Sequence, residues 1–211
     1  MRFVLKLSYA CARHLASALN EKHNKKAVYY YGFFIVFATL IEAGILILTS
    51  LLFGTLIPSL IIVAIFGTLR LFAGGYHFDT LGRCLFISLG FILAVALASQ
   101  YTYQYWSTIS VIIFLMTTFT VGLIIFIKYA PKDTPTKPIT DPAKSKKLKK
   151  LSVLYLCILL LICSILTILS LKLYVIATCF GVLLEIFSVS PVGHAFFDKI
   201  KNGLNNASVS N

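Results

Sequence analysis

Residues 84–127 read CLFISLGFILAVALASQYTYQYWSTISVIIFLMTTFTVGLIIFI and contain no Asp, Glu, Lys or Arg. A helix needs about 20 apolar residues to cross a bilayer, and this stretch is roughly twice that length. Its centre, residues 100–107, gathers the Tyr and Trp side chains that are typical of a membrane–water interface. The stretch therefore predicts two membrane-spanning helices joined by a turn at the interface.

Two further stretches repeat this pattern on either side. Residues 27–69 carry a single charge, Glu42, and residues 151–197 carry only Lys172 and Glu185. Each stretch is again long enough for two spans with a turn between them. The sequence thus predicts an all-α membrane protein with about six transmembrane helices in three hairpins.

The composition of the chain supports a membrane protein. Of its 211 residues, 59% are hydrophobic and 12% are charged, and the mean hydropathy is +0.91. Soluble domains average about 45–50% apolar and about 25% charged residues. The net charge of +12 does not point to nucleic acid, because the basic residues lie between apolar runs, where a bilayer explains them.

The basic residues also predict the orientation in the membrane. With six spans, 18 of the 19 Lys and Arg residues fall on one side, and the other side holds only Lys172. Because positively charged residues stay cytoplasmic, both termini are expected in the cytoplasm. Residues 1–20 contain Arg13 and His14 where a signal peptide needs an unbroken apolar run, so no cleavable signal peptide is expected.

The whole chain, 1–211, is expected to form a single integral membrane domain. Its N-terminal segment repeats Leu7, Cys11, Leu15 and Ala18 at helical spacing, which is typical of an amphipathic helix at the inner membrane surface. The expected segments are a cytoplasmic amphipathic helix at 1–26, spans 1 and 2 at 27–69, a catalytic cytoplasmic loop at 70–83, spans 3 and 4 at 84–127, a basic cytoplasmic loop at 128–150, spans 5 and 6 at 151–197, and a polar tail at 198–211.

The five cysteines predict neither a disulfide framework nor a metal site. Their number is odd, and their spacing fits no zinc pattern. Three of them lie in the last apolar stretch, where a cysteine usually behaves as a small hydrophobic residue. The five are Cys11, Cys84, Cys157, Cys163 and Cys179.

The stretch from Arg70 to Cys84, RLFAGGYHFDTLGRC, concentrates reactive side chains in a chain that is otherwise poor in polar groups. A thiol attacks as the thiolate, and a neighbouring imidazolium or guanidinium favours that form. His77 can act as the base or ion-pair partner of Cys84 and then as the acid for a leaving amine. Arg83 adds positive potential, and a position in the first turn of a helix would add the helix dipole.

Helix geometry sets a condition on this pair. Seven residues along one straight helix give a rise of about 10.5 Å, whereas proton transfer needs a separation of about 3 Å. His77 must therefore lie on a separate turn that folds back toward Cys84, and the Gly74-Gly75 pair permits such a turn. Asp79 is a weaker candidate for orienting the imidazole, because a separation of two residues gives awkward geometry.

Structural readings compete with this catalytic pair. Cys84 can be a small helix-packing residue, and His77 can be an interfacial histidine with a hydrogen-bonded ring. Cys11 and His14 also lie three residues apart on an expected helix, but no cluster of Gly or Arg accompanies them.

Two acids within the apolar stretches suggest a different class of function. Glu42 and Glu185 are costly inside a bilayer, and such acids often mark ion or proton pathways. A small ion- or proton-linked transporter that uses Glu42, Glu185 and His77 is therefore the alternative function. A plainer reading is that polar side chains between the helices satisfy both acids. A third reading is a non-enzymatic partner or chaperone of an amphipathic peptide.

The 70–84 stretch resembles the accessory gene regulator protein B family, the membrane peptidases of Gram-positive peptide quorum sensing. The shared pattern is Arg70, Gly74-Gly75, His77 and, seven residues on, Cys84. The six spans, the basic amphipathic N-terminus and the length of the chain agree with the same family.

Two further segments carry the resemblance. One is Lys128-Tyr-Ala-Pro131, followed by Lys137-Pro138 and a Lys-rich stretch, and the other is Glu185 with Pro191. The resemblance thus covers nearly the whole chain. The Ser- and Asn-rich tail at 202–211 departs from it and carries no family motif.

The resemblance implies a cysteine endopeptidase of the bacterial cell membrane that removes the C-terminal tail of a short quorum-sensing propeptide. Cys84, assisted by His77, would form an acyl-enzyme thioester, and a thiol or hydroxyl of the peptide would then close a thiolactone or lactone. Arg70 is carried over as a supporting residue that binds a substrate carboxylate or the oxyanion, and Gly75 as a requirement of the turn.

The resemblance also implies partners. These are an amphipathic propeptide substrate and the lipid bilayer, with no nucleic acid, no organic cofactor and no metal. A homodimer is compatible with the sequence, which does not demonstrate one.

Overall fold

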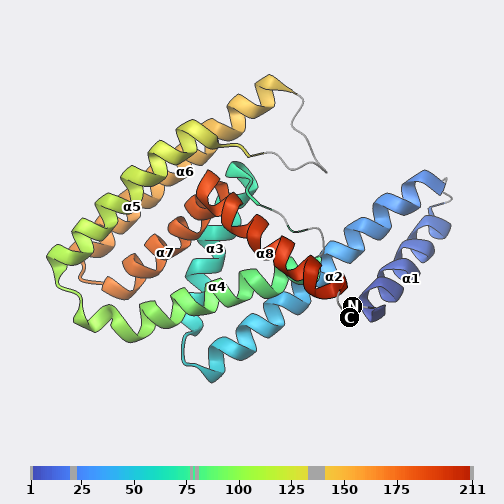
Figure 1. The fold of residues 1–211 in the computed structure, drawn as a ribbon, viewed down its shortest axis with the longest axis horizontal. Helices are drawn as coiled ribbons and strands as arrows, with labels where there is room; N and C mark the ends of the chain where they lie inside the picture. Colours follow the sequence, from blue (N-terminus) through green and yellow to red (C-terminus); the bar gives the residue numbers. More distant parts are fainter. Residues whose placement is uncertain (1, 20–22, 77, 79–80, 133–140, 210–211) are drawn as a thin grey trace. The chain divides into compact units, whose positions relative to one another are not determined.

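The computed structural model describes residues 2–19, 23–76, 78, 81–132 and 141–209, and these form α-helices with one short 3-10 helix (Figure 1). Six helical stretches among them are long and apolar enough to cross a membrane, which confirms the expected number of spans. The helices are α1 (Arg2–Ala18), α2 (His23–Leu52), α3 (Leu56–Ala73), α4 (Leu81–Thr102), η1 (Tyr103–Tyr105), α5 (Thr108–Tyr129), α6 (Pro142–Ile168), α7 (Lys172–Val189) and α8 (Pro191–Val209).

The chain divides into two compact units, 1–52 and 53–211. The first unit consists of α1 packed along α2. Its contact face on α1 carries Ser8, Ala12 and Ala16, which are buried and small enough for the two helices to approach closely. The expected apolar face is adjacent to it, and there Leu7 remains exposed. That α1 lies on the inner membrane surface stays a prediction, as does the single membrane domain.

The second unit is built around α7. This span packs against α3, α4, α5, α6 and α8, and it is the most buried of the six. Its most extensive contact is with α3, where a Cβ atom placed on Gly181 would lie 3.0 Å from Cβ of Ile65 and 3.2 Å from the carbonyl oxygen of Ile62. Small residues allow such contacts in a membrane, where close packing rather than water exclusion joins helices.

The pairing of consecutive spans into three hairpins is not confirmed. In the second unit α4 packs on α3 and α7, whereas α5 packs on α6 and α7 (Figure 1). The 3-10 turn η1 and the extended backbone of Trp106 and Ser107 separate α4 from α5. This connection is fixed in place because Lys172 Nζ donates a hydrogen bond of 2.7 Å to the Trp106 carbonyl oxygen.

The last span ends earlier than the sequence pattern indicated. α7 stops at Val189, and Pro191 opens α8, which occupies the segment expected as the end of a span and a polar tail. Ser190 explains the break, since its Oγ donates to the Phe187 carbonyl oxygen and accepts from the Gly193 amide, at 3.0 Å each. Proline is well suited to the first position of a helix, where its missing N–H is not needed.

The Lys-rich part of the expected basic loop is helical. Asp141 caps the N-terminus of α6 by accepting a hydrogen bond of 2.9 Å from the Ala143 amide, and Pro142 follows it at the first helical position. The lysines at 144–150 therefore occupy the first turns of α6. Residues 133–140 lie outside the described residues.

We expect Gly181→Leu to destabilise the second unit by about 1–3 kcal/mol, because the added side chain overpacks the α3–α7 contact. Thermal unfolding in detergent or nanodiscs measures the effect. Gly90→Leu is the matched control, since a Cβ atom on Gly90 meets nothing within 4 Å. Equal unfolding temperatures for the two variants would contradict the central place given to the α3–α7 contact.

Candidate active site

The Gly74-Gly75 pair forms a sharp turn directly after α3. Gly74 has a φ of +76° and Gly75 a φ of +138°, which side chains of L-residues rarely allow. The turn pairs with the segment after α5, where the Lys132 amide donates a hydrogen bond of 2.8 Å to the Ala73 carbonyl oxygen and Gly74 forms a β-bridge with Lys132. The two sequence segments that carried the resemblance, around 74–75 and around 128–131, thus lie beside each other.

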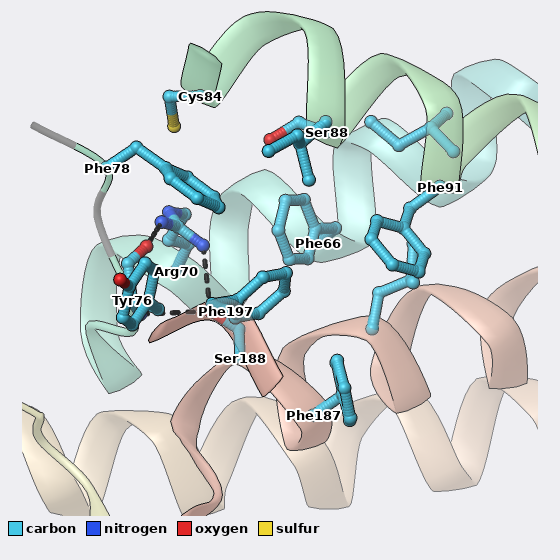
Figure 2. A pocket seen from close by; sticks show the side chains of 13 residues that line it. Phe66, Arg70, Tyr76, Phe78, Cys84, Ser88, Phe91, Phe187, Ser188 and Phe197 are labelled. Carbon is cyan, nitrogen blue, oxygen red and sulfur yellow. Dashed lines mark hydrogen bonds between the residues drawn. The ribbon is translucent and has the colours of Figure 1, made fainter. Parts of the chain in front are cut away.

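Arg70 and Ser188 hold the backbone that leaves this turn. The Tyr76 amide donates to both the carbonyl oxygen and Oγ of Ser188, at 3.1 and 3.2 Å. Arg70 donates from Nη1 to Ser188 Oγ at 2.9 Å and from Nη2 to the Tyr76 carbonyl oxygen. These bonds join the last turn of α3, the glycine turn and the end of α7 into one network (Figure 2).

The side chain of Tyr76 docks on α8. Its hydroxyl donates a hydrogen bond of 2.8 Å to Asp198 Oδ1. Its ring stacks on Phe197 at a centroid distance of 5.1 Å and meets His194 edge-on at 5.2 Å. Tyr76 is therefore held at its backbone by α3 and α7 and at its hydroxyl by α8.

Cys84 lies in the first turn of α4. It is half-buried, and its sulfur points toward a pocket of about 440 Å³, counting the space that is open to solvent (Figure 2). Arg70 lines the same pocket from α3. The structure thus brings Arg70 and Cys84 to one pocket, and Gly75 lies beside the Arg70 guanidinium in the glycine turn.

The walls of this pocket are largely aromatic. Cys84, Ser88 and Phe91 come from one face of α4, while Phe187 and Phe197 come from α7 and α8. Six aromatic rings line the pocket in total, and those of Phe91, Phe187 and Phe197 contact one another at centroid distances of 5.4 to 6.4 Å. An apolar pocket with a few polar groups is typical of a binding site for an organic ligand.

The expected base, His77, lies outside the described residues. His77 and Asp79 are not among the described residues, so the predicted pairing of His77 with Cys84 stays a prediction. The competing pair, Cys11 and His14, belongs to α1 in the other unit, where Cys11 is half-buried and His14 is exposed.

The remaining candidates are scattered over the described part of the chain. All five cysteines are free, and no three described His, Cys, Asp or Glu side chains gather as metal ligands. Glu42 is half-buried in α2. Glu185 is 0% exposed in α7, and neither carboxyl oxygen has a hydrogen-bond partner among the described residues.

Sequence reasoning missed the contributions of Tyr76, Ser188, Phe197 and Asp198. The last two were assigned to a span end and a tail because α8 was not recognised. A signal for it was present, since Ser190-Pro191 is a typical start of a helix. No sequence signal marks Ser188, whose role depends on the crossing of α3 and α7.

We expect Gly75→Ala to disrupt the site. A Cβ atom at this position would lie 2.4 Å from Ser188 Oγ, and the left-handed φ alone costs an alanine about 1–3 kcal/mol. The measurement is the rate at which a water-soluble maleimide labels Cys84, followed by mass spectrometry alongside the unfolding temperature. Gly90→Ala, which adds the same methyl group in open space, is the control, and unchanged labelling in Gly75→Ala would contradict this account.

His194 gives the site a pH dependence. Burial and the nearby Lys132 ammonium hold the pKa of His194 below its ordinary value, and Asp198 opposes them only in part. The histidine in the unfolded chain keeps a pKa of about 6.5. The contribution of neutral His194 to the free energy of unfolding is therefore present above that pH, and it is lost as the pH falls through the lower pKa of the folded state. On acidification to about pH 5.5, the unfolding temperature should therefore fall further for the wild type than for His194→Gln. Parallel decreases would contradict this.

Comparisons with known proteins identify the family. The family model of accessory gene regulator B matches residues 8–189. The putative AgrB-like protein 2 of Clostridium perfringens is 29% identical over 162 residues, which cover 74% of this chain and 73% of the relative. A putative AgrB-like protein of Clostridium acetobutylicum is 32% identical over 58% of this chain and 56% of its own length.

A third relative is the protein FsrB of Enterococcus faecalis, which is 29% identical over 64% of this chain and 53% of its own length. No solved structure matches the chain. Since the family model spans the glycine turn, Cys84 and all six spans, this chain belongs to the accessory gene regulator B family, whose role is in quorum sensing.

Proposed function

We propose that this protein is a membrane cysteine endopeptidase that removes the C-terminal tail of a quorum-sensing propeptide. The observation that carries the proposal is the position of Cys84, which opens from the first turn of α4 into a pocket that also contains Arg70. A nucleophilic cysteine needs access, positive potential and a shaped cavity beside it. Membership of the family supports the same activity.

The reaction has two acyl transfers. The Cys84 thiolate attacks the carbonyl carbon of the scissile peptide bond, the C–N bond breaks, and the leaving amine takes a proton from the His77 imidazolium. The tail departs, and the rest of the peptide remains as a thioester on Cys84. A thiol or hydroxyl within that peptide then attacks the thioester carbonyl and expels the Cys84 thiolate, which closes a thiolactone or lactone ring.

The apolar walls favour ring closure over hydrolysis. A thioester that is surrounded by aromatic side chains meets little water, so an intramolecular nucleophile competes well with hydrolysis. Arg70 supports the site by holding the Tyr76 backbone and Ser188, because two of its nitrogens donate there. Its positive charge also favours an oxyanion that forms in the same pocket.

We place this site at the cytoplasmic face, with both termini in the cytoplasm. The end of α3, the start of α4 and the end of α5 meet at one end of the second unit, and Arg70, Arg83, Lys128 and Lys132 belong to it. Lys172 begins α7 at the other end of that span. The positive-inside rule therefore supports the orientation, and an amphipathic propeptide would reach the site from the inner leaflet.

We expect Cys84→Ala and His77→Ala each to lower propeptide cleavage by at least about 100-fold, because each removes a group that takes part in bond breaking. The assay co-expresses the protein with a tagged candidate propeptide and follows release of the tail, with membrane levels of each variant checked by immunoblot. Cys157→Ala, which alters an exposed cysteine on α6, is the control. Full cleavage by Cys84→Ala would end the peptidase proposal.

One observation favours the transport alternative, which is the buried Glu185 without a hydrogen-bond partner among the described residues. A transporter would show proton or ion flux in liposomes that survives Cys84→Ala but not Glu185→Gln. A peptidase would instead lose propeptide cleavage in Cys84→Ala. The flux assay and the cleavage assay therefore distinguish the two functions.

A further inference from the structure

We infer that the pocket beside Cys84 binds a large apolar or aromatic side chain, namely that of the substrate residue whose carbonyl carbon forms the thioester. This inference rests on the proposed function and adds the substrate class to it. Phe197 of α8 and Phe91 of α4 are the residues that would determine this specificity (Figure 2).

The geometry connects the sulfur with the aromatic walls. Ser88 lies four residues after Cys84, and Phe91 and Ile92 lie three and four residues after Ser88. The four residues therefore share one face of α4, and all of them line the pocket. An acyl group on the sulfur is covalently tied to the mouth of this cavity. The side chain of the acylated residue is only two bonds from the thioester carbonyl carbon, and the pocket is the space within its reach.

The chemistry of the walls selects apolar groups. Phe66, Phe187 and Phe197 face the cavity with Ile and Leu side chains between them, and Phe197 is only 8% exposed. A charged side chain would lose its hydration there and would need a partner. The nearest candidate is Arg70, whose Nη1 and Nη2 already donate to Ser188 and Tyr76.

One wall of the pocket comes from α8, beyond the residues that the family model matches. The family match ends at residue 189, whereas Phe197 belongs to α8, which begins at Pro191. The Tyr76 hydroxyl bond to Asp198, next to Phe197, fastens this wall to the glycine turn. The pocket therefore combines the candidate nucleophile on α4 with a wall that the C-terminal helix α8 supplies.

The test uses short peptide thioesters, acetyl-Gly-Gly-X, with X as Phe, Ala or Glu, on the full-length protein in nanodiscs. Exchange of the thioester onto Cys84 releases the small thiol and leaves a peptide adduct that mass spectrometry detects. We expect the Phe donor to acylate Cys84 at least about tenfold faster than the Ala donor, and the Glu donor to be the slowest. Phe197→Ala and Phe91→Ala should reduce the Phe-to-Ala ratio to about twofold or less.

The chain offers two matched controls. Phe86→Ala removes a ring from the same helix as Cys84, but that ring is 80% exposed and does not line the pocket, so the ratio should stay unchanged. Cys157 is exposed on α6, and its adducts report how strongly each donor partitions into lipid. Phe197→Leu keeps an apolar wall if Phe197→Ala fails to fold, and it should give an intermediate ratio.

The outcomes separate this inference from the proposed function. Adducts that form on Cys84 at the same rate for all three donors would overturn the inference and leave the peptidase intact. A faster Glu donor would also overturn it, by showing recognition through Arg70, and so would an equal Phe preference at Cys157, by showing partition into lipid. The absence of an adduct on Cys84 with every donor would instead contradict the thioester mechanism itself.

Discussion

The arrangement of the site depends on the hydrogen bonds of Arg70 with Ser188 and Tyr76. A guanidinium at the end of a membrane span needs fixed acceptors, and here a serine hydroxyl on α7 and a backbone carbonyl provide them. The same Ser188 also accepts from the Tyr76 amide, so one residue of α7 satisfies two donors from the α3 side. These bonds hold the backbone that leaves α3 as far as Tyr76.

The helix α7 makes this network possible. Association of helices in a bilayer relies on close packing, and Gly181 lets α3 approach α7 closely. Further along the same pair of helices, Arg70 of α3 meets Ser188 of α7. The glycine turn extends the contact beyond the helices, because Gly74 pairs with Lys132 from the segment after α5. Three connections that are far apart in the sequence thus converge at one end of the second unit.

Sequence patterns predicted where the helices of this protein lie in the chain better than they predicted which helices pack against one another. Long charge-free runs located the six spans, and the glycine pair with Cys84 located the turn and the helix start. The pattern could not predict that α4 would pack on α3 and α7, because lipid-facing and protein-facing residues are equally apolar. It also concealed α8, since Phe196 and Phe197 continue the apolar run past the break at Pro191. His77, the residue on which the dyad prediction depends, lies outside the described residues.

The C-terminal helix α8 supplies one wall of the cavity beside Cys84. The family model matches residues 8–189, and Phe197 from α8, just beyond that match, lines the cavity next to the nucleophile. Drift in this short terminal segment can alter the shape of the cavity while Cys84, Arg70 and the glycine turn stay untouched. Two related signalling systems in one cell can thus come to process different peptides, through changes in α8 rather than in the reactive residues.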